Sequence, residues 1–141
     1  MPRSSSKPGF YYDYMNLIMM KNKLKVFKPR FNWEWEEART YPKFREMGKD
    51  AWIKLASKGD VFTVTKKIVE EIRNTDAADI SSFNNLDQVK QLRVIRQFRK
   101  GIYELPIIYL DKKGLTLVGG NTRLTAMMVK EGEAKVWIFK V

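Results

Sequence analysis

The chain has 141 residues, of which 44% are hydrophobic and 13% aromatic, enough apolar material for the core of one domain but not of two. Twenty-seven lysines and arginines against sixteen aspartates and glutamates give a formal net charge of +11 at pH 7. Because the sequence contains neither histidine nor cysteine, it excludes histidine-metal nuclease centres, Ser-His-Asp relays, zinc ribbons and cysteine nucleophiles.

This composition narrows both the partner and the chemistry. A positive surface favours a polyanion, by default nucleic acid, although a basic chain kept soluble by its charge has the same composition. Any proton transfer must fall to Asp, Glu, Lys or Tyr, and any metal would be bound by oxygen, as Mg²⁺ is. We expect a cytosolic protein without a membrane partner, because cysteine is lacking, no signal peptide is recognisable and residues 17–20 are too short to cross a bilayer.

The N-terminal segment is basic and aromatic. Residues 1–9 are expected to form a flexible basic tail, and one domain follows over residues 10–141. Basic residues interleaved with aromatic ones suit stacking on bases and neutralising phosphates, but they equally suit aromatic rings that fill a core while lysines stay in water. The side chains assigned here to DNA binding are Lys21, Lys23, Lys25 and Arg30.

Residues 31–44 combine two tryptophans with three carboxylates in an otherwise basic region. Asn32 is a suitable N-cap for a helix over residues 33–39, and Pro42 would end or restart that helix. Carboxylates among apolar side chains are candidate bases or Mg²⁺ ligands, whereas glutamates also simply favour a helix N-terminus or pair with arginines. The candidates for a catalytic role are Glu34, Glu36 and Glu37.

The middle of the chain is expected to alternate between helices and short connections. Residues 43–58 have an imperfect apolar face and predict a helix that Gly59 ends. Residues 60–64 predict a short strand, and residues 65–74 a second helix. Residues 75–85 are small and polar, so they predict a loop, whose length makes it either mobile or a ligand contact.

The clearest helical pattern covers residues 86–100, with Asn85 as a suitable cap and Gly101 as the stop. Its apolar positions recur every three residues and are Leu86, Val89, Leu92, Ile95 and Phe98. Its other faces carry cations, which either follow a nucleic-acid backbone or simply face water. These cations, which we assign to DNA binding, are Lys90, Arg93, Arg96, Arg99 and Lys100.

The last third of the chain predicts strand, hairpin, strand, helix and strand. Residues 104–111 form an apolar run, and residues 111–114 are typical of a hairpin turn. A buried strand over residues 115–118 and a helix that stops at Gly132 come next. Residues 134–141 then alternate between apolar and polar, as a closing strand does.

A glycine pair joins the second of these strands to the helix. Gly119 and Gly120 can adopt backbone angles closed to other residues. Asn121 or Thr122 is then a good N-cap. The free amides at the helix start, its positive dipole end and Arg123 together form a site for an anion, most naturally a phosphate. The alternative is a tight turn whose arginine is only solvated.

This arrangement, with its Pro106-Ile-Ile stretch and its Gly119-Gly-Asn-Thr-Arg-Leu-Thr-Ala126 loop, resembles the ParB/sulfiredoxin-like fold family. The resemblance covers residues 104–141 and extends to the helix before them. It implies an α+β fold in which a small mixed sheet is surrounded by helices, with residues 85–141 as the core and residues 10–80 as a mostly helical, basic extension. In that family a Gly-x-x-Arg loop holds nucleotide phosphates, and members include DNA-binding partitioning CTPases, sulfiredoxins, free-serine kinases and phage proteins of DNA metabolism.

Departures from the family restrict the chemistry. Sulfiredoxins need a cysteine where this chain has Asn121, and partitioning proteins usually carry a second arginine where it has Thr122. Serine kinases show an acid and a histidine where Gly119 and Asn121 stand. The binding loop is retained, so a catalytic acid or base must come from elsewhere: from the glutamates of residues 34–37, or from Asp111, which a hairpin turn also explains.

Three hypotheses follow. The first is a phosphotransferase that uses ATP, or another nucleoside triphosphate, and Mg²⁺ to phosphorylate DNA, with a hydroxymethylated base of the 5-hydroxymethyluridine type in phage DNA as acceptor. It would then act in the host cytoplasm. The second is a non-catalytic module that binds DNA or a nucleotide, which the missing acid and histidine of the loop favour. The third is a nuclease, which requires two or more carboxylates converging on a metal.

Overall fold

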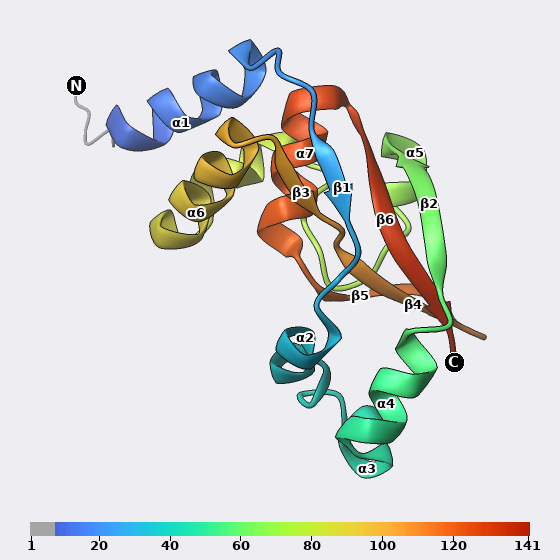
Figure 1. The fold of residues 1–141 in the computed structure, drawn as a ribbon. Coiled ribbons are helices and arrows are strands. Elements are labelled where there is room, and N and C mark those ends of the chain that lie inside the picture. Colours follow the sequence, from blue (N-terminus) through green and yellow to red (C-terminus); the bar gives the residue numbers. More distant parts are fainter. Residues whose placement is uncertain (1–7) are drawn as a thin grey trace.

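The computed structural model describes residues 8–141, and its first helix, α1, comprises Pro8–Met19. The predicted tail therefore lies outside the described residues except for Pro8 and Gly9, which belong to α1. The described chain is an α+β structure, as predicted, in which helices flank a small mixed sheet (Figure 1).

The main sheet has four strands in the order β2-β6-β4-β5. The pairs β2–β6 and β4–β5 are antiparallel, whereas β4 and β6 run parallel. A second, parallel pair is formed by β1 and β3. The strands are β1 (Lys25–Phe27), β2 (Asp60–Thr65), β3 (Ile102–Glu104), β4 (Ile107–Asp111), β5 (Gly114–Gly119) and β6 (Glu133–Lys140). The predicted hairpin at residues 111–114 is confirmed, with Asp111 opposite Gly114.

One chain segment takes part in both sheets. The amide of Leu105 donates to the carbonyl of Phe27, the last residue of β1, at 3.0 Å. One residue later, the carbonyl of Pro106 accepts from the amide of Trp137 in β6 at 2.8 Å. The segment thus exchanges one neighbouring strand for another at Pro106, and Glu104 lies just before this exchange.

The helices form two groups, with α2, α3 and α4 at one end of the sheet and α1, α6 and α7 near the other (Figure 1). Their bounds are α2 (Phe31–Ala38), α3 (Pro42–Met47), α4 (Lys49–Ala56), α5 (Lys66–Val69), the 3₁₀ helix η1 (Ile80–Asn85), α6 (Gln88–Arg99) and α7 (Asn121–Glu131). Within the second group, α1 packs on α6 and α7, and η1 packs on α7.

Two of the predicted helices are interrupted. The helix expected over residues 43–58 is divided into α3 and α4 by Gly48, whose φ of 94° no helix accommodates. The helix expected over residues 65–74 ends early as α5, because the main chain of Arg73 pairs with β5 instead. The amide of Arg73 donates to the carbonyl of Leu115, and its carbonyl accepts from Leu117, both at 2.9 Å. Long-range pairing thus overrides the local helical pattern.

The inward face of α6 agrees with the predicted one at Ile95 and Phe98, which are buried, and differs from it in the first half of the helix. Gln91 and Val94 are buried, whereas Val89 is 63% exposed. A step of three residues turns a helix by about 300° rather than a full circle, so positions spaced by three drift around the axis. The predicted cap is also displaced, since α6 begins after Asp87, whose side chain accepts from the amide of Val89.

An aromatic cluster joins the first helix group to the sheet. Phe44 and Trp52 are fully buried against Tyr109 of β4 and Phe139 of β6. The ring centroids of Phe44 and Tyr109 lie 5.2 Å apart at an interplanar angle of 84°, an edge-to-face arrangement. From α2, Trp35 packs on Trp52 at 5.8 Å. This cluster fixes α2 on the sheet and leaves its opposite face for the site.

Candidate functional site

A cavity of about 750 Å³ lies where segments distant in sequence meet. Its walls come from Arg30 and α2, from residues 74–76, from α6, from Glu104 and from the loop of residues 117–123. The volume is within the range of about 300–1,000 Å³ that small-ligand pockets occupy.

Most of the residues selected from sequence converge on this cavity. Those lining it are Glu34, Glu36 and Glu37, the loop residues Gly119, Gly120, Asn121, Thr122 and Arg123, and the cations Arg30, Lys90 and Arg93. Those outside its lining are Asp111, Lys21, Lys23, Lys25, Arg96, Arg99 and Lys100. The tryptophan-glutamate segment, the glycine loop and part of the basic helix, which were selected on separate grounds, therefore share one site.

Gly120 starts α7 in a way that the sequence predicts only in part. It has a left-handed φ of 96° and is itself the N-cap, so the prediction of Asn121 or Thr122 as cap is wrong. The first helical hydrogen bond runs from the amide of Leu124 to the carbonyl of Gly120 at 2.8 Å. The side-chain oxygen of Asn121 accepts instead from the hydroxyl of Thr75. No side chain of the described residues caps α7, so its first amides stay available.

The two glycines are required for different reasons. A Cβ on Gly120 would lie 2.8 Å from the Cα of Pro106, and the left-handed backbone adds strain for any other residue. A Cβ on Gly119 would overlap the Oε2 atom of Glu34. Gly119 thus leaves room for the carboxylate of Glu34, and Gly120 takes the left-handed conformation that the turn requires.

Arg123 and Glu34 form a shielded ion pair at this turn. The Nη2 atom of Arg123 lies 3.0 Å from Oε1 of Glu34, and the two side chains are only 16% and 6% exposed. The Nε atom of Arg123 is buried and has no hydrogen-bond partner among the described residues. A charge removed from water is costly unless it is paired, so each side chain depends on the other.

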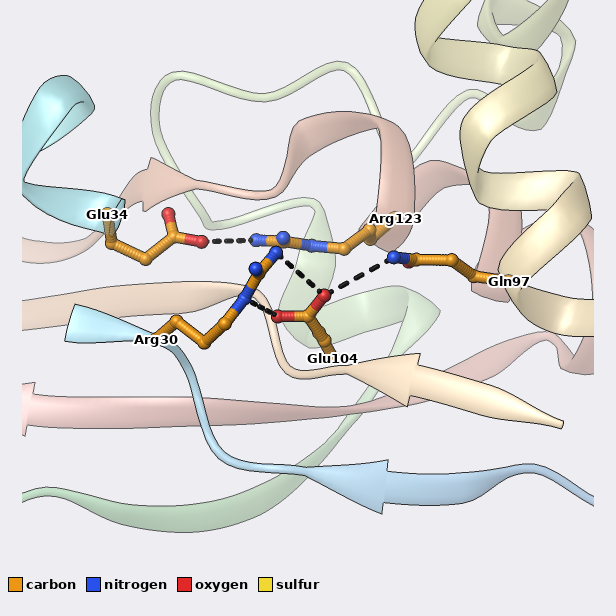
Figure 2. Close-up of polar contacts among 5 residues, drawn as sticks. All are labelled: Arg30, Glu34, Gln97, Glu104 and Arg123. Carbon is orange, nitrogen blue, oxygen red and sulfur yellow. Dashed lines mark hydrogen bonds and ion pairs between the residues drawn. The ribbon is translucent and has the colours of Figure 1, made fainter. Parts of the chain in front are cut away.

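A second ion pair lies beside the first. Arg30 donates through Nε and Nη2 to the two carboxylate oxygens of Glu104 at 2.8 and 3.1 Å. Gln97 of α6 donates to the same carboxylate at 3.4 Å. Figure 2 shows these side chains gathered with Glu34 and Arg123, with charges of opposite sign facing one another. The first pair ties α2 to α7, and the second ties β3 and α6 to the residue before α2.

The remaining candidate carboxylates differ in their surroundings. The side chain of Glu36 is 75% exposed and lies 3.8 Å from Arg39. Glu37 is exposed, lines the cavity and forms no ion pair with any described residue. Tyr103 is not a candidate base, because burial raises the pKa of its hydroxyl, which donates to the carbonyl of Lys135 at 2.7 Å.

Asp111 does not belong to the site, so its assignment as a catalytic residue is corrected. It lies at the β4–β5 hairpin, where Lys43 pairs with it at 3.0 Å and Arg73 at 3.4 Å. The hydrogen bond from Lys43 lowers the pKa of the Asp111 carboxyl, and the amide of Lys113 acts in the same direction. These contacts explain Asp111 as a structural residue of the hairpin.

Several residues of the cavity were not selected from sequence. Glu104 was noted only as the start of an apolar run, where a lone acid is a signal that could have been followed. Thr75 and Asp76 belong to the loop for which a ligand contact was one of two alternatives. Trp33 was not selected either, although it stands beside the selected glutamates. It lines the cavity and is 66% exposed. Long-range packing, absent from local patterns, brings these residues together.

The acidic side chains of the cavity determine how it could hold a metal ion. Among residues 8–141, no group of three or more acidic, histidine or cysteine side chains is placed to hold a metal ion. The acidic side chains lining the cavity are Glu34, Glu36, Glu37, Asp76, Asp87 and Glu104. Of these, Glu34, Glu36 and Glu104 are paired with arginines and Asp87 caps α6, so Glu37 and Asp76 are the carboxylates left for a ligand-borne cation.

Comparisons of the chain with protein-family models, curated proteins and solved structures find no match. Within residues 8–141, no helix has the length and apolar character needed to cross a membrane. The functional conclusion is therefore built on the cavity itself.

Proposed function

We propose that this chain is a nucleotide-dependent phosphotransferase that acts on DNA, a relative of the ParB/sulfiredoxin-like proteins. ATP or another nucleoside triphosphate, with Mg²⁺, would be the phosphoryl donor, and a hydroxymethylated base of the 5-hydroxymethyluridine type the acceptor. The observation that carries the proposal is the meeting, in one cavity, of an uncapped helix N-terminus, an arginine and an uncommitted carboxylate.

The donor's phosphates would lie at the start of α7. The amides of residues 121–123 and the positive end of the helix dipole attract an anion. Arg123 points its guanidinium to the same place, and Glu34 holds the group in position through one of its nitrogens. A guanidinium has five N–H donors, so this ion pair does not exhaust it. Phosphoryl transfer relies mainly on such positioning and charge neutralisation.

The acceptor would be activated by Glu37. Its Cγ lies 3.6 Å from the point where a Cβ on Gly119 would be, next to the phosphate loop. As the acceptor oxygen bonds to the γ-phosphorus, the bond to the β–γ bridging oxygen breaks, the nucleoside diphosphate leaves and Glu37 accepts the hydroxyl proton. Mg²⁺ would be held by the nucleotide's phosphates with Glu37 or Asp76, and it would neutralise phosphate charge.

The DNA would be attracted by the cations around the cavity. Lys90 and Arg93 are exposed on its wall. The other predicted DNA contacts are exposed outside it and are Lys21, Lys23, Lys25, Arg96, Arg99 and Lys100. Contacts of this kind supply affinity and salt dependence rather than sequence preference.

A non-catalytic binding module is the second candidate. The observation in its favour is the ion pair between Glu34 and Arg123, which commits the buried carboxylate nearest the loop to holding an arginine. A nuclease has less support, because two-metal cleavage needs more converging carboxylates than the described residues supply.

The test is a transfer assay with Mg²⁺, γ-labelled ATP and DNA with or without 5-hydroxymethyluracil. We expect label on the hydroxymethylated DNA, reduced by roughly 100-fold or more in Glu37→Gln, which removes the base. Glu36→Gln, an exposed neighbour on the same helix, is the matched control and should stay near wild type. Arg123→Lys should also reduce transfer, because one ammonium cannot replace a fork of donors.

Three other outcomes would be decisive. If the protein binds the DNA but neither labels nor cleaves it, the chain is the non-catalytic binding module. Nicked DNA would establish the nuclease. Equal losses of phosphoryl transfer in Glu37→Gln and Glu36→Gln would show that Glu37 is not the base.

A further inference from the structure

Trp33 is placed unusually for a tryptophan. It lines the cavity, yet it is 66% exposed, while the other tryptophans of the first helix group, Trp35 and Trp52, pack in the aromatic cluster. A large apolar ring left in water at a cavity wall contributes little to the core, and tryptophan, with an apolar body and a polar N–H, is enriched at interfaces.

The ring of Trp33 is held in place from one side only. The guanidinium carbon of Arg30 lies 5.0 Å from its ring centroid, in a cation–π arrangement. Arg30 is itself fixed by two hydrogen bonds to the buried carboxylate of Glu104. No other aromatic ring of the described residues pairs with Trp33. Arg30 thus braces the indole, and the exposed part of the ring offers a surface for a flat ligand.

A row of cations leads away from this cavity wall. Lys90 and Arg93 line the cavity, and Arg96 and Arg99 follow on α6 at the same spacing of three residues, exposed and outside the lining. Residues three apart on a helix are neighbours on its surface, but each step of three turns by about 300°, so these four cations form an oblique row that crosses the exposed face of α6 from one side to the other. A free nucleotide would need only the cations inside the cavity, whereas a polynucleotide strand would also use those that continue beyond it.

We infer that the cavity takes an unpaired nucleotide of a DNA strand, extrahelical or single-stranded, whose base stacks on Trp33 and whose flanking phosphates contact Lys90 and Arg93. The inference rests on the proposed function in taking DNA as the polyanion. A base inside a duplex shows only its edges in the grooves, and its faces are covered by neighbouring base pairs. Stacking on an aromatic side chain therefore requires a base out of the duplex stack.

The test measures binding, not transfer, by fluorescence anisotropy of labelled oligonucleotides: a single strand, a perfect duplex and a duplex with one bulged nucleotide. Single-stranded and bulged DNA should bind about tenfold or more tightly than the perfect duplex. Trp33→Ala should weaken binding of those two by about tenfold, as the loss of one stacking contact does, and leave the duplex unchanged. Trp33→Phe should retain most of the affinity.

Matched controls separate the stacking from general electrostatics. Phe27→Ala removes a ring that is 39% exposed outside the cavity and should change nothing beyond twofold. The double variant Lys90→Gln/Arg93→Gln should weaken binding of every DNA and reduce its salt dependence, more than Arg99→Gln does.

Three results would overturn the inference. One is a perfect duplex bound as tightly as the single strand; another is an unchanged affinity of Trp33→Ala for the single strand. Loss of ATP binding in Trp33→Ala with DNA binding intact would assign the indole to the free nucleotide and also refute the inference. A protein that binds unpaired DNA through Trp33 but transfers no phosphoryl group would refute the proposed function alone.

Discussion

Different sides of α2 carry different kinds of side chain. On one face, Phe31 and Trp35 pack edge-on or tilted against Trp52 in a cluster of rings that needs no charge. On the opposite side, which borders the cavity, Trp33 lies exposed, and between the two sides Glu34 is buried as one half of an ion pair. The first face is explained by packing alone, because rings that leave water stabilise the fold.

The cavity face is not explained in that way. Burying two charges to pair them stabilises a fold little, and apolar residues of similar volume often do as well or better. An exposed ring contributes little to the core. The difference indicates that one face of α2 holds the fold together and the other serves the site. Each of the following variants can break or sharpen that division.

The largest loss of stability is expected for Trp52→Ala, in the centre of the aromatic cluster. The side chain is fully buried, so its removal should lower the free energy of unfolding by about 4 kcal/mol. Urea denaturation followed by circular dichroism measures this. Trp33→Ala is the matched control and should change stability by no more than about 0.5 kcal/mol. Similar losses in the two variants would abolish the distinction between the faces.

Next comes the ion pair between Arg123 and Glu34. Arg123→Ala should cost about 3 kcal/mol, because it leaves a buried carboxylate without its partner. The double variant with Glu34→Ala should lose less than the sum of the single losses, by about 1–3 kcal/mol. Denaturation of the four proteins of this cycle provides the measurement. Strict additivity would mean that the two side chains do not depend on each other.

Gly119→Ala should cost about 2 kcal/mol, since its new methyl group would displace the carboxylate of Glu34 from Arg123. In a Glu34→Ala background the obstacle is gone, so the same substitution should be nearly neutral. The comparison by thermal denaturation tells a steric conflict with Glu34 apart from a general intolerance of the loop. An equal cost in both backgrounds would point to the backbone instead.

The smallest effect is expected for Asp111→Asn, which should leave phosphoryl transfer unchanged. The hydrogen bond from Lys43 lowers the pKa of the Asp111 carboxyl below its ordinary value of 3.8, so the ionised form stabilises the fold. The wild type should therefore melt slightly above the variant at neutral pH. This difference should vanish as the pH falls below 3.8 and the carboxyl takes up its proton. A loss of transfer activity would return Asp111 to the site.

Local signals account for the parts of the fold that were predicted well. The hairpin at residues 111–114, the glycine turn and the stop at Gly132 each depend on a few adjacent residues. Other parts, predicted wrongly or not predicted, depend on distant residues. The backbone of Arg73 leaves its helical pattern to pair with β5, and the three-residue strand β1 exists because β3 lies beside it.

The residues of the site likewise include some that local sequence predicts and others that only long-range packing brings together. Gly120 and Arg123 were found because their chemistry is visible in one short loop. The partnership of Arg123 with Glu34 was not predictable, since nothing in either segment specifies the other. Glu37 was selected together with Glu34 and Glu36, and only the packing of α2 separates the buried, paired Glu34 from Glu36 and Glu37, which are exposed and line the cavity.

The separation in sequence of the paired charges has a consequence for folding. Glu34 and Arg123 are 89 positions apart, and Arg30 and Glu104 are 74 apart. Closing such long loops lowers the entropy of the chain before the contacts they bring together can stabilise it. Contacts of this kind therefore form late and slow the folding of a domain. During synthesis, Arg30 and Glu34 must wait for Glu104 and Arg123 to leave the ribosome before they meet their partners. The cavity is therefore completed only after its last wall, the start of α7, has been made.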